Sequence, residues 1–218
     1  MIIAIDGPAG SGKTTVAKRL AKRLGFSFLD TGATYRALTY AALEKGLDLE
    51  DEERLADLAN NLNLKIEDSK IYLNGSDISK EIRKPRIDKN ISKIVSFVKV
   101  RQIMSSLQRQ EAAGKNCVVE GRDITTVVFP DAEFKFYLDA DQKIRAKRRI
   151  HQLLKEGEVV DSDQVEADLI RRDDADKNRK VGSLKLTKET RYLDTTKLII
   201  PEVIEKLFDI VSQESKNN

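Results

Sequence analysis

Apolar and polar positions along the chain follow two periods that alternate with each other. Short apolar runs of strand length occur at 1–6, 26–30, 117–119, 134–138 and 195–200. Segments with helical spacing lie between them, and 15–24 is the clearest because Val16, Leu20 and Leu24 recur every four residues. Strands that alternate with helices are typical of βα units, so the pattern predicts an α/β fold around a central parallel sheet.

Further helices are expected at about 32–45, 51–62, 88–114, 142–155, 161–176 and from 201 onward. The segment 88–114 could form one helix or two that break near Phe97. Residues 63–89 differ, because apolar and polar residues alternate there and turn residues at 68–69 and 74–75 separate the runs. We expect a small antiparallel insert at about 63–89, a core at 1–62, 90–140 and 180–218, and a helical cover at 141–180.

Composition limits the partners of the protein. The chain has 218 residues, enough for one α/β domain, and 39 basic against 36 acidic residues leave a net charge of +3. Such a charge gives no broad positive field for binding nucleic acid. A single cysteine, no apparent signal peptide and no apolar run of membrane-spanning length predict a cytoplasmic protein without a membrane partner. We further expect a monomer.

The segment between the first strand and the first helix matches G-x-x-x-x-G-K-[ST], the phosphate-binding loop, and reads Gly7-Pro8-Ala9-Gly10-Ser11-Gly12-Lys13-Thr14-Thr15. Glycines let the backbone wrap around phosphate oxygens, and the helix N-terminus adds a positive dipole end. Lys13 is then expected to reach the β- and γ-phosphates, and the Thr14 hydroxyl to ligate Mg²⁺. A glycine-rich turn without a ligand is the alternative.

Polar side chains gather at two further strand ends. Thr31, Tyr35 and Arg36 follow the second strand, and E-G-R-D at 120–123 follows the strand at 117–119. Ligands of open α/β sheets bind at the carboxyl ends of strands, so these groups could hold a second phosphorylated molecule or orient Mg²⁺-bound water. The alternatives are that Thr31 caps a helix, that Tyr35 is a core aromatic and that 120–123 is a solvated turn.

The helices at 142–155 and 161–176 are rich in charge and are joined through a glycine. They suit a mobile cover that brings arginines onto transferring phosphates. Solvated faces with i,i+4 ion pairs are the plainer alternative. We expect His151 at the surface or in helix packing and Cys117 in the core, whereas Ser92 and Arg101 could be surface residues or ligands.

Four stretches together resemble the bacterial cytidylate kinases of the nucleoside-monophosphate kinase family, and the resemblance covers nearly the whole chain. They are I-D-G-P-A-G-S-G-K at 5–13, L-D-T-G-A-T-Y-R at 29–36, E-G-R-D-I-T-T-V-V-F-P at 120–130 and R-D-D-A-D-K-N-R at 172–179. The resemblance implies a P-loop NTPase fold with three αβα layers, a monophosphate-binding insert and a helical lid. It also implies phosphorylation of CMP and dCMP to CDP and dCDP with ATP and Mg²⁺.

The resemblance also implies roles for single residues. Gly7 to Thr15 would bind the ATP phosphates, with Thr14 near Mg²⁺. The groups facing the transferred phosphoryl group would be Lys13, Arg148, Arg149 and Arg179. The positions that match the CMP or dCMP site are Thr31, Tyr35, Arg36, Ser92, Arg101, Arg122, Asp123, Arg172 and Asp176. Of these, Arg36, Arg101 and Arg122 would clamp the phosphate, Ser92, Arg172 and Asp176 would read the cytosine, and Asp123 the sugar.

Two positions depart from the family pattern. Glu120 stands where aspartate is usual, and its extra methylene changes its reach toward a Mg²⁺ water shell. Thr125 stands where glycine is common, which is expected to stiffen that loop.

In-line transfer to a monophosphate needs no strong general base, because the attacking oxygen is already anionic at neutral pH. That suits a chain with one histidine. The nearest alternative is a P-loop kinase that acts on UMP, dTMP or a non-nucleotide acceptor. The second alternative is a nucleotide-operated switch, but a GTPase switch would need a guanine-reading N-K-x-D stretch, which is missing from the sequence.

Overall fold

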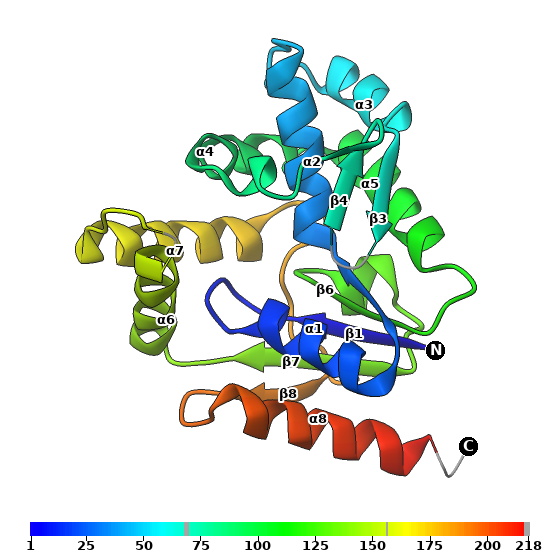
Figure 1. Ribbon diagram of the computed structural model, residues 1–218, viewed down its shortest axis with the longest axis vertical. Helices are drawn as coiled ribbons and strands as arrows, with labels where there is room; N and C mark the ends of the chain where they lie inside the picture. The colour runs from blue at the N-terminus through cyan, green and yellow to red at the C-terminus, as the bar shows by residue number, and fades with distance from the viewer. Residues whose placement is uncertain (68–69, 156, 216–218) are drawn as a thin grey trace.

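The computed structural model describes residues 1–67, 70–155 and 157–215, and in them five parallel strands form the central sheet in the order β2-β6-β1-β7-β8 (Figure 1). The strands are β1 (Ile2–Asp6), β2 (Ser27–Asp30), β6 (Cys117–Gly121), β7 (Phe134–Asp139) and β8 (Arg191–Asp194). Every neighbouring pair runs parallel. The predicted α/β fold with a central parallel sheet is therefore confirmed.

Helices cover both faces of this sheet, because its inner strands are apolar on both faces. Ile3 and Ile5 of β1 pack on one face, against α1 (Lys13–Leu24) and α8 (Ile200–Glu214). Ala4 lies between them in sequence and packs on the opposite face, in a cluster that includes the end of α5 (Val98–Ala112). The period of two along β1 thus produces the three αβα layers.

A second apolar cluster joins α2 (Thr31–Glu44), α3 (Glu52–Asn60), α4 (Pro85–Ile94) and α5. The segment predicted at 88–114 is two helices. Pro85 opens α4 in the first turn, where its missing N–H removes no helical hydrogen bond. Phe97 has extended dihedral angles and precedes α5, so the break lies at the expected position.

The antiparallel insert is a sheet of β3 (Leu64–Glu67), β4 (Lys70–Leu73) and β5 (Ser76–Asp77), followed by the 3₁₀ turn η1 (Glu81–Arg83). Ile71, Ile78 and Ile82 bury its inner face against Ala33 and Ala37 of α2. The turn at 74–75 has positive φ at both residues, as a tight hairpin requires. The turn predicted at 68–69 lies outside the described residues.

The charged helices α6 (Gln142–Lys155) and α7 (Ser162–Asn178) stand beside the sheet at the end where β7 leads into α6 (Figure 1). Asp161 caps α7 by accepting hydrogen bonds from Asp163 N and Gln164 N. Both helices therefore lie at the carboxyl edge of the strands, where the sequence patterns place the polar clusters. The division into core, insert and lid remains a prediction.

The last strand was expected at 195–200 and lies instead at Arg191–Asp194, so that prediction is wrong. Thr195 directly follows the strand, and its N–H and its hydroxyl both donate to the Asp139 carbonyl, at 2.8 Å each. Leu198 and Ile200, the first residue of α8, pack onto the core. Their apolar character reflects this packing and not a strand, while the true strand is an exposed edge with a polar sequence.

Asp6 fastens the end of β1 to the segment that follows β6. Its buried carboxylate accepts from Ile124 N (2.9 Å), Thr125 N (2.8 Å) and Thr125 Oγ1 (2.7 Å) at the start of the π-helical turn η2 (Ile124–Val128). Burial raises the pKa of Asp6 to about 6, although the Thr125 and Ile124 donors act in the opposite direction.

Among the described residues no helix is long and apolar enough to cross a membrane.

We predict that Asp6→Asn at pH 8 destabilises the protein by about 2 kcal/mol or more, since the new amide group faces an N–H donor and leaves it unsatisfied in the core. Thr125→Val removes one of the three hydrogen bonds and is expected to cost about 1 kcal/mol. Urea unfolding measures both. If Asp6→Asn lowers the free energy of unfolding no more than Thr125→Val does, the Asp6 carboxylate does not hold these two segments together as we describe.

Candidate active site

The loop at residues 7–12 places an open helix N-terminus at the edge of the sheet. Gly10 and Gly12 have φ of +75° and +87°, and a Cβ on Gly10 would lie 2.9 Å from the Arg145 carbonyl oxygen. Gly12 is the N-cap of α1 and supplies no side-chain cap. The first N–H groups of α1 therefore keep their capacity to bind an external anion.

Lys13 and Thr14 connect this loop to the end of β6. Lys13 is buried, and its Nζ donates to the Pro8 carbonyl at 3.0 Å. Thr14 Oγ1 donates to Glu120 Oε1 at 2.7 Å. Burial lowers the pKa of Lys13. Burial raises the pKa of Glu120, and the nearby Asp30 carboxylate raises it further. A hydroxyl and a carboxylate beside an anion-binding loop are the oxygen donors that suit Mg²⁺.

The second strand end contributes Thr31 and Tyr35 from α2. Asp30, and not Thr31, caps this helix, accepting from Ala33 N at 2.9 Å. Thr31 Oγ1 donates to the Glu120 carbonyl at 2.8 Å and so links the ends of β2 and β6. Tyr35 is buried in the cluster beneath α2, and its ring centroid lies 5.5 Å from the Arg101 guanidinium.

Arg101 and Asp123 form a buried ion pair, with 3% and 5% of their surfaces exposed. Arg101 also donates to the Val95 carbonyl at 3.3 Å. Its Nε has no hydrogen-bond partner among the described residues, which is unusual for a buried donor. A buried charge with a spare donor is more consistent with a ligand site than with the surface position that was the alternative for Arg101.

Asp176 of α7 forms ion pairs with two arginines that are far apart in the sequence. It accepts from Arg122 Nε at 2.7 Å and also pairs with Arg179. Burial acts to raise the pKa of Asp176, but Arg122, Arg179 and Arg172 together hold it below its ordinary value. Arg122 lies 54 positions from Asp176, so folding of α7 onto the sheet edge assembles this group.

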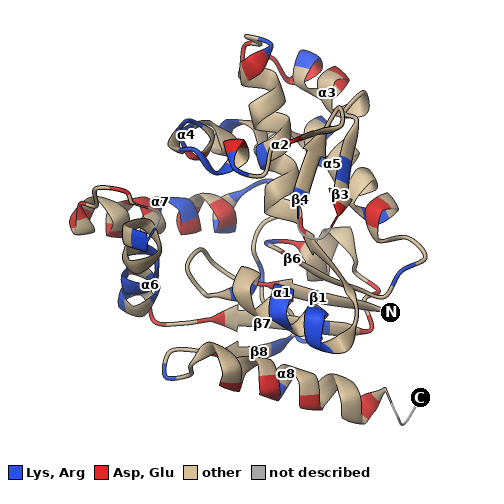
Figure 2. Cartoon of the chain, in the orientation of Figure 1, with Lys and Arg blue, Asp and Glu red and all other residues tan. Residues whose placement is uncertain are grey.

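A third group surrounds Asp88 of α4. Arg36 Nη2 lies 2.6 Å from Asp88 Oδ1, Arg149 Nη2 lies 3.6 Å from Oδ2, and Arg172 Nη1 lies 4.0 Å from Oδ1. Figure 2 shows Lys and Arg on α4, α6 and α7, the elements that meet here. The sequence analysis missed Asp88. It stands four residues before Ser92, which is exposed on α4, and that helical spacing was the available signal.

Asp173 of α7 and Arg145 of α6 hold the phosphate-binding loop and were also missed. Arg145 is buried, pairs with Asp173 and donates to the Ala9 carbonyl at 3.0 Å. Asp173 accepts from Ala9 N at 3.3 Å. Asp173 lies three residues before Asp176, on the same side of the helix, which could have identified it.

Arg148 lies apart from these groups. Its guanidinium donates to the Thr195 carbonyl at 2.6 Å and to Thr195 Oγ1 at 3.0 Å, and it approaches the Ser11 carbonyl at 3.5 Å. The structure thus sets Arg148 against the phosphate-binding loop, whereas Arg149 faces Asp88 and Arg179 faces Asp176.

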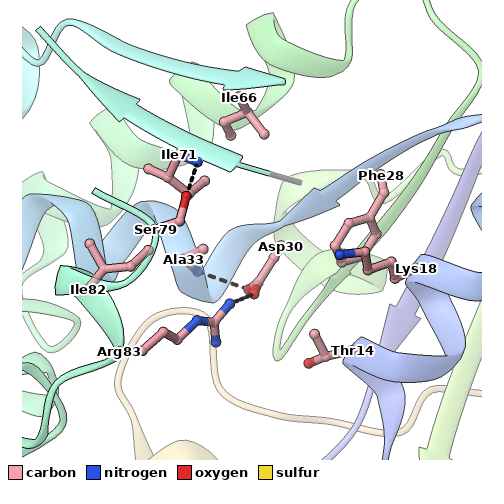
Figure 3. A pocket seen from close by; sticks show the side chains of 10 residues that line it. All are labelled: Thr14, Lys18, Phe28, Asp30, Ala33, Ile66, Ile71, Ser79, Ile82 and Arg83. Atoms are coloured by element: carbon pink, nitrogen blue, oxygen red, sulfur yellow. Dashed lines mark hydrogen bonds and ion pairs between the residues drawn. The ribbon is translucent and has the colours of Figure 1, made fainter. Parts of the chain in front are cut away.

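A pocket beside Thr14 separates α1 from the insert (Figure 3). Asp30 and Arg83 form an ion pair in its wall, at 2.9 Å, and Lys18 and Phe28 also line it, side by side. The ion pair fastens η1 of the insert to the end of β2, next to the polar groups of the sheet edge.

Solved structures share the fold. A gluconokinase from Sinorhizobium meliloti 1021 matches with a TM-score of 0.50 and 14% identity, over 99% of this chain and 93% of that chain. A shikimate kinase from Acinetobacter baumannii, in complex with shikimate, matches with a TM-score of 0.50 and 17% identity, over 98% and 93%. At these identities the likeness shows the P-loop kinase fold and not the acceptor.

Sequence relatives are closer. The cytidylate kinase from Caldanaerobacter subterraneus subsp. tengcongensis is 44% identical over 98% of this chain and 96% of its own length. The cytidylate kinase from Carboxydothermus hydrogenoformans is 42% identical over 99% of both. The family described as "Cytidylate kinase" matches residues 3–213. This chain therefore belongs to the cytidylate kinase family, whose members are nucleoside-monophosphate kinases.

Proposed function

We propose that the protein transfers the γ-phosphoryl group of ATP, with Mg²⁺, to CMP and dCMP, giving ADP with CDP or dCDP. One observation carries the proposal. Arginines from α2, α5, α7 and the segment after β6 gather at the same edge of the sheet as the open N-terminus of α1. A site of this kind suits two phosphorylated molecules, one on the loop and one on the arginines.

The donor side of the proposal is the loop from Gly7 to Thr15. Its N–H groups and Lys13 would hold the ATP phosphates, and Thr14 would ligate Mg²⁺. Glu120 already accepts the Thr14 hydroxyl, so its carboxylate suits a water bound to the same ion. The ion would supply neutralisation of charge on the phosphates. Arg148 contacts the Ser11 carbonyl and would position this loop.

The acceptor side lies around α2, α4 and α7. Arg36, Arg101 and Arg122 would clamp the phosphate of CMP, because a guanidinium offers paired donors that match phosphate oxygens. Ser92, Arg172 and Asp176 would read the cytosine, and Asp123 the sugar. Thr31 and Tyr35 would form the wall between the two sides, where Thr31 bonds the Glu120 carbonyl.

Catalysis in this proposal comes from placement and charge. The attacking phosphate oxygen needs no proton removed, and the one histidine, His151, is exposed on α6. Lys13, Arg149 and Arg179 would neutralise charge on the transferred group as α6 and α7 exclude water. All of these residues belong to one chain, so a monomer would carry the complete site.

We predict a narrow acceptor profile. Coupled measurement of ADP release from ATP and Mg²⁺ with CMP, dCMP, UMP, AMP, GMP and dTMP is expected to give strong turnover with CMP and dCMP and weak turnover with UMP. A flat profile across the six nucleotides contradicts the acceptor assignment and leaves the phosphate-binding loop in place. Preference for UMP or dTMP supports the alternative kinase.

We predict that Arg36→Ala changes the kinetics in a different way from Lys13→Ala and Arg179→Ala. Arg36→Ala is expected to raise KM for CMP about tenfold or more with a smaller effect on kcat, because it removes a phosphate contact of the bound acceptor. Lys13→Ala and Arg179→Ala are expected to lower kcat more than CMP affinity. Arg86→Ala is the matched control, since Arg86 is exposed and pairs with Glu44. An unchanged KM for CMP in Arg36→Ala refutes its assignment.

We also predict a role for the glycine at 182. Gly182 has φ of +66°, and a Cβ there would lie 2.2 Å from Arg101 Nη2 and 2.3 Å from Asp123 Oδ2. Gly182→Ala would therefore displace this ion pair and raise KM for CMP about tenfold. Gly114→Ala is the control, because Gly114 has φ of +69° and open space around it. Both variants carry similar backbone strain, so equal kinetics in the two would exclude the effect.

A further inference from the structure

Asp88 is the shared partner of three guanidinium groups from three helices. Arg36 of α2 donates to it at 2.6 Å, Arg149 of α6 lies within 3.6 Å and Arg172 of α7 within 4.0 Å. Asp88 itself belongs to α4. A single carboxylate therefore stands among arginines that reach it from both the acceptor side and the charged helices.

The charges around Asp88 do not balance. Three guanidiniums face one carboxylate, so the group keeps an excess of two positive charges. The Asp88 side chain is 30% exposed and that of Arg172 is 42% exposed, so an anion from solvent can reach them. Burial acts to raise the pKa of Asp88, but Arg36, Arg172 and Arg149 hold it below its ordinary value. The carboxylate is thus ionised at neutral pH.

A phosphate monoester has the chemistry to replace this carboxylate. It carries nearly two negative charges at pH 7 and has three acceptor oxygens, whereas a carboxylate carries one charge and has two oxygens. Arg36 does not need Asp88 to keep its position, because it lies buried and also approaches the Ile82 carbonyl at 3.4 Å.

We propose that Asp88 is an internal competitor for the phosphate of the acceptor. Its carboxylate pairs with Arg36 in the free protein, with Arg149 and Arg172 close by, and the acceptor phosphate takes over Arg36 when it binds. The inference rests on the proposed function, in which Arg36 receives that phosphate. Competition from Asp88 weakens binding of the nucleotide. A free nucleoside has no phosphate, so it neither displaces Asp88 nor competes with it. The residue then lowers the affinity for phosphorylated acceptors and leaves the affinity for the nucleoside unchanged.

The sign of the effect separates this role from a structural one. If Asp88 only orients Arg36, its removal weakens binding of the nucleotide. If Asp88 competes, its removal strengthens that binding. Asp88→Asn keeps the shape of the side chain and removes the charge, and Asp88→Ser removes the charge by shortening it.

The experiment is calorimetric titration of the full chain with CMP, cytidine and inorganic phosphate at fixed ionic strength. Asp88→Asn and Asp88→Ser are expected to lower the Kd for CMP about five- to tenfold, the scale of one partly exposed charge-assisted pair. The Kd for cytidine is expected to stay unchanged. Asp168→Asn is the control, because it changes the net charge equally at an exposed site on α7 where Asp168 pairs with Arg171.

An unchanged or weaker affinity for CMP in both Asp88 variants overturns the proposal, and so does an equal gain for cytidine or for Asp168→Asn. The inorganic phosphate titration separates this result from failure of the proposed function. If CMP is not phosphorylated but both variants bind phosphate more tightly, the exchange at Asp88 stands and the acceptor assignment falls. If CMP is phosphorylated and neither anion binds more tightly, the inference alone falls.

Discussion

The pairing of buried guanidiniums with carboxylates is the interaction on which the rest of the site depends. An arginine removed from water without a partner costs several kcal/mol, so a site that gathers arginines must also supply anions when its ligands are absent. This protein supplies Asp123 to Arg101, Asp176 to Arg122 and Asp173 to Arg145. Each pair joins different elements, so the pairing that offsets the burial of the charged arginines also draws the helices together over the sheet edge.

The parallel sheet decides where these pairs meet. All five strands of the central sheet end at one edge, and the segments that leave β1, β2, β6 and β7 carry the phosphate-binding loop, Thr31, Arg122 and the start of α6. The solved gluconokinase and shikimate kinase, which share this fold, are named for different acceptors. In the proposed function, the shared edge of the sheet would hold the phosphate donor, and the arginine pairs would distinguish the acceptor side.

The parts of this arrangement that sequence could predict are those with a local cause. Strand, glycine loop and helix follow one another without interruption, so 7–15 is visible from spacing alone, and the insert is visible from its period of two. Asp88 and Asp173 were missed because an acidic residue on a charged helix looks the same whether it faces solvent or an arginine from another helix. The last strand was misplaced because Leu198 and Ile200, just before and at the start of α8, are apolar for packing on the core, while the edge strand at Arg191–Asp194 needs few apolar residues.

The two departures from the family pattern fall on opposite sides of the phosphate-binding loop. Thr125, where glycine is common, uses its hydroxyl to bond Asp6 at the end of β1 (2.7 Å). Glu120, where aspartate is usual, reaches Thr14 at the start of α1 (2.7 Å). Both residues come from the segment at and after β6, so this one segment holds the loop at its entrance and at its exit. A longer carboxylate and an added hydroxyl thus have the same consequence, which is a firmer hold on the backbone at residues 7–15, where we propose that phosphate binds.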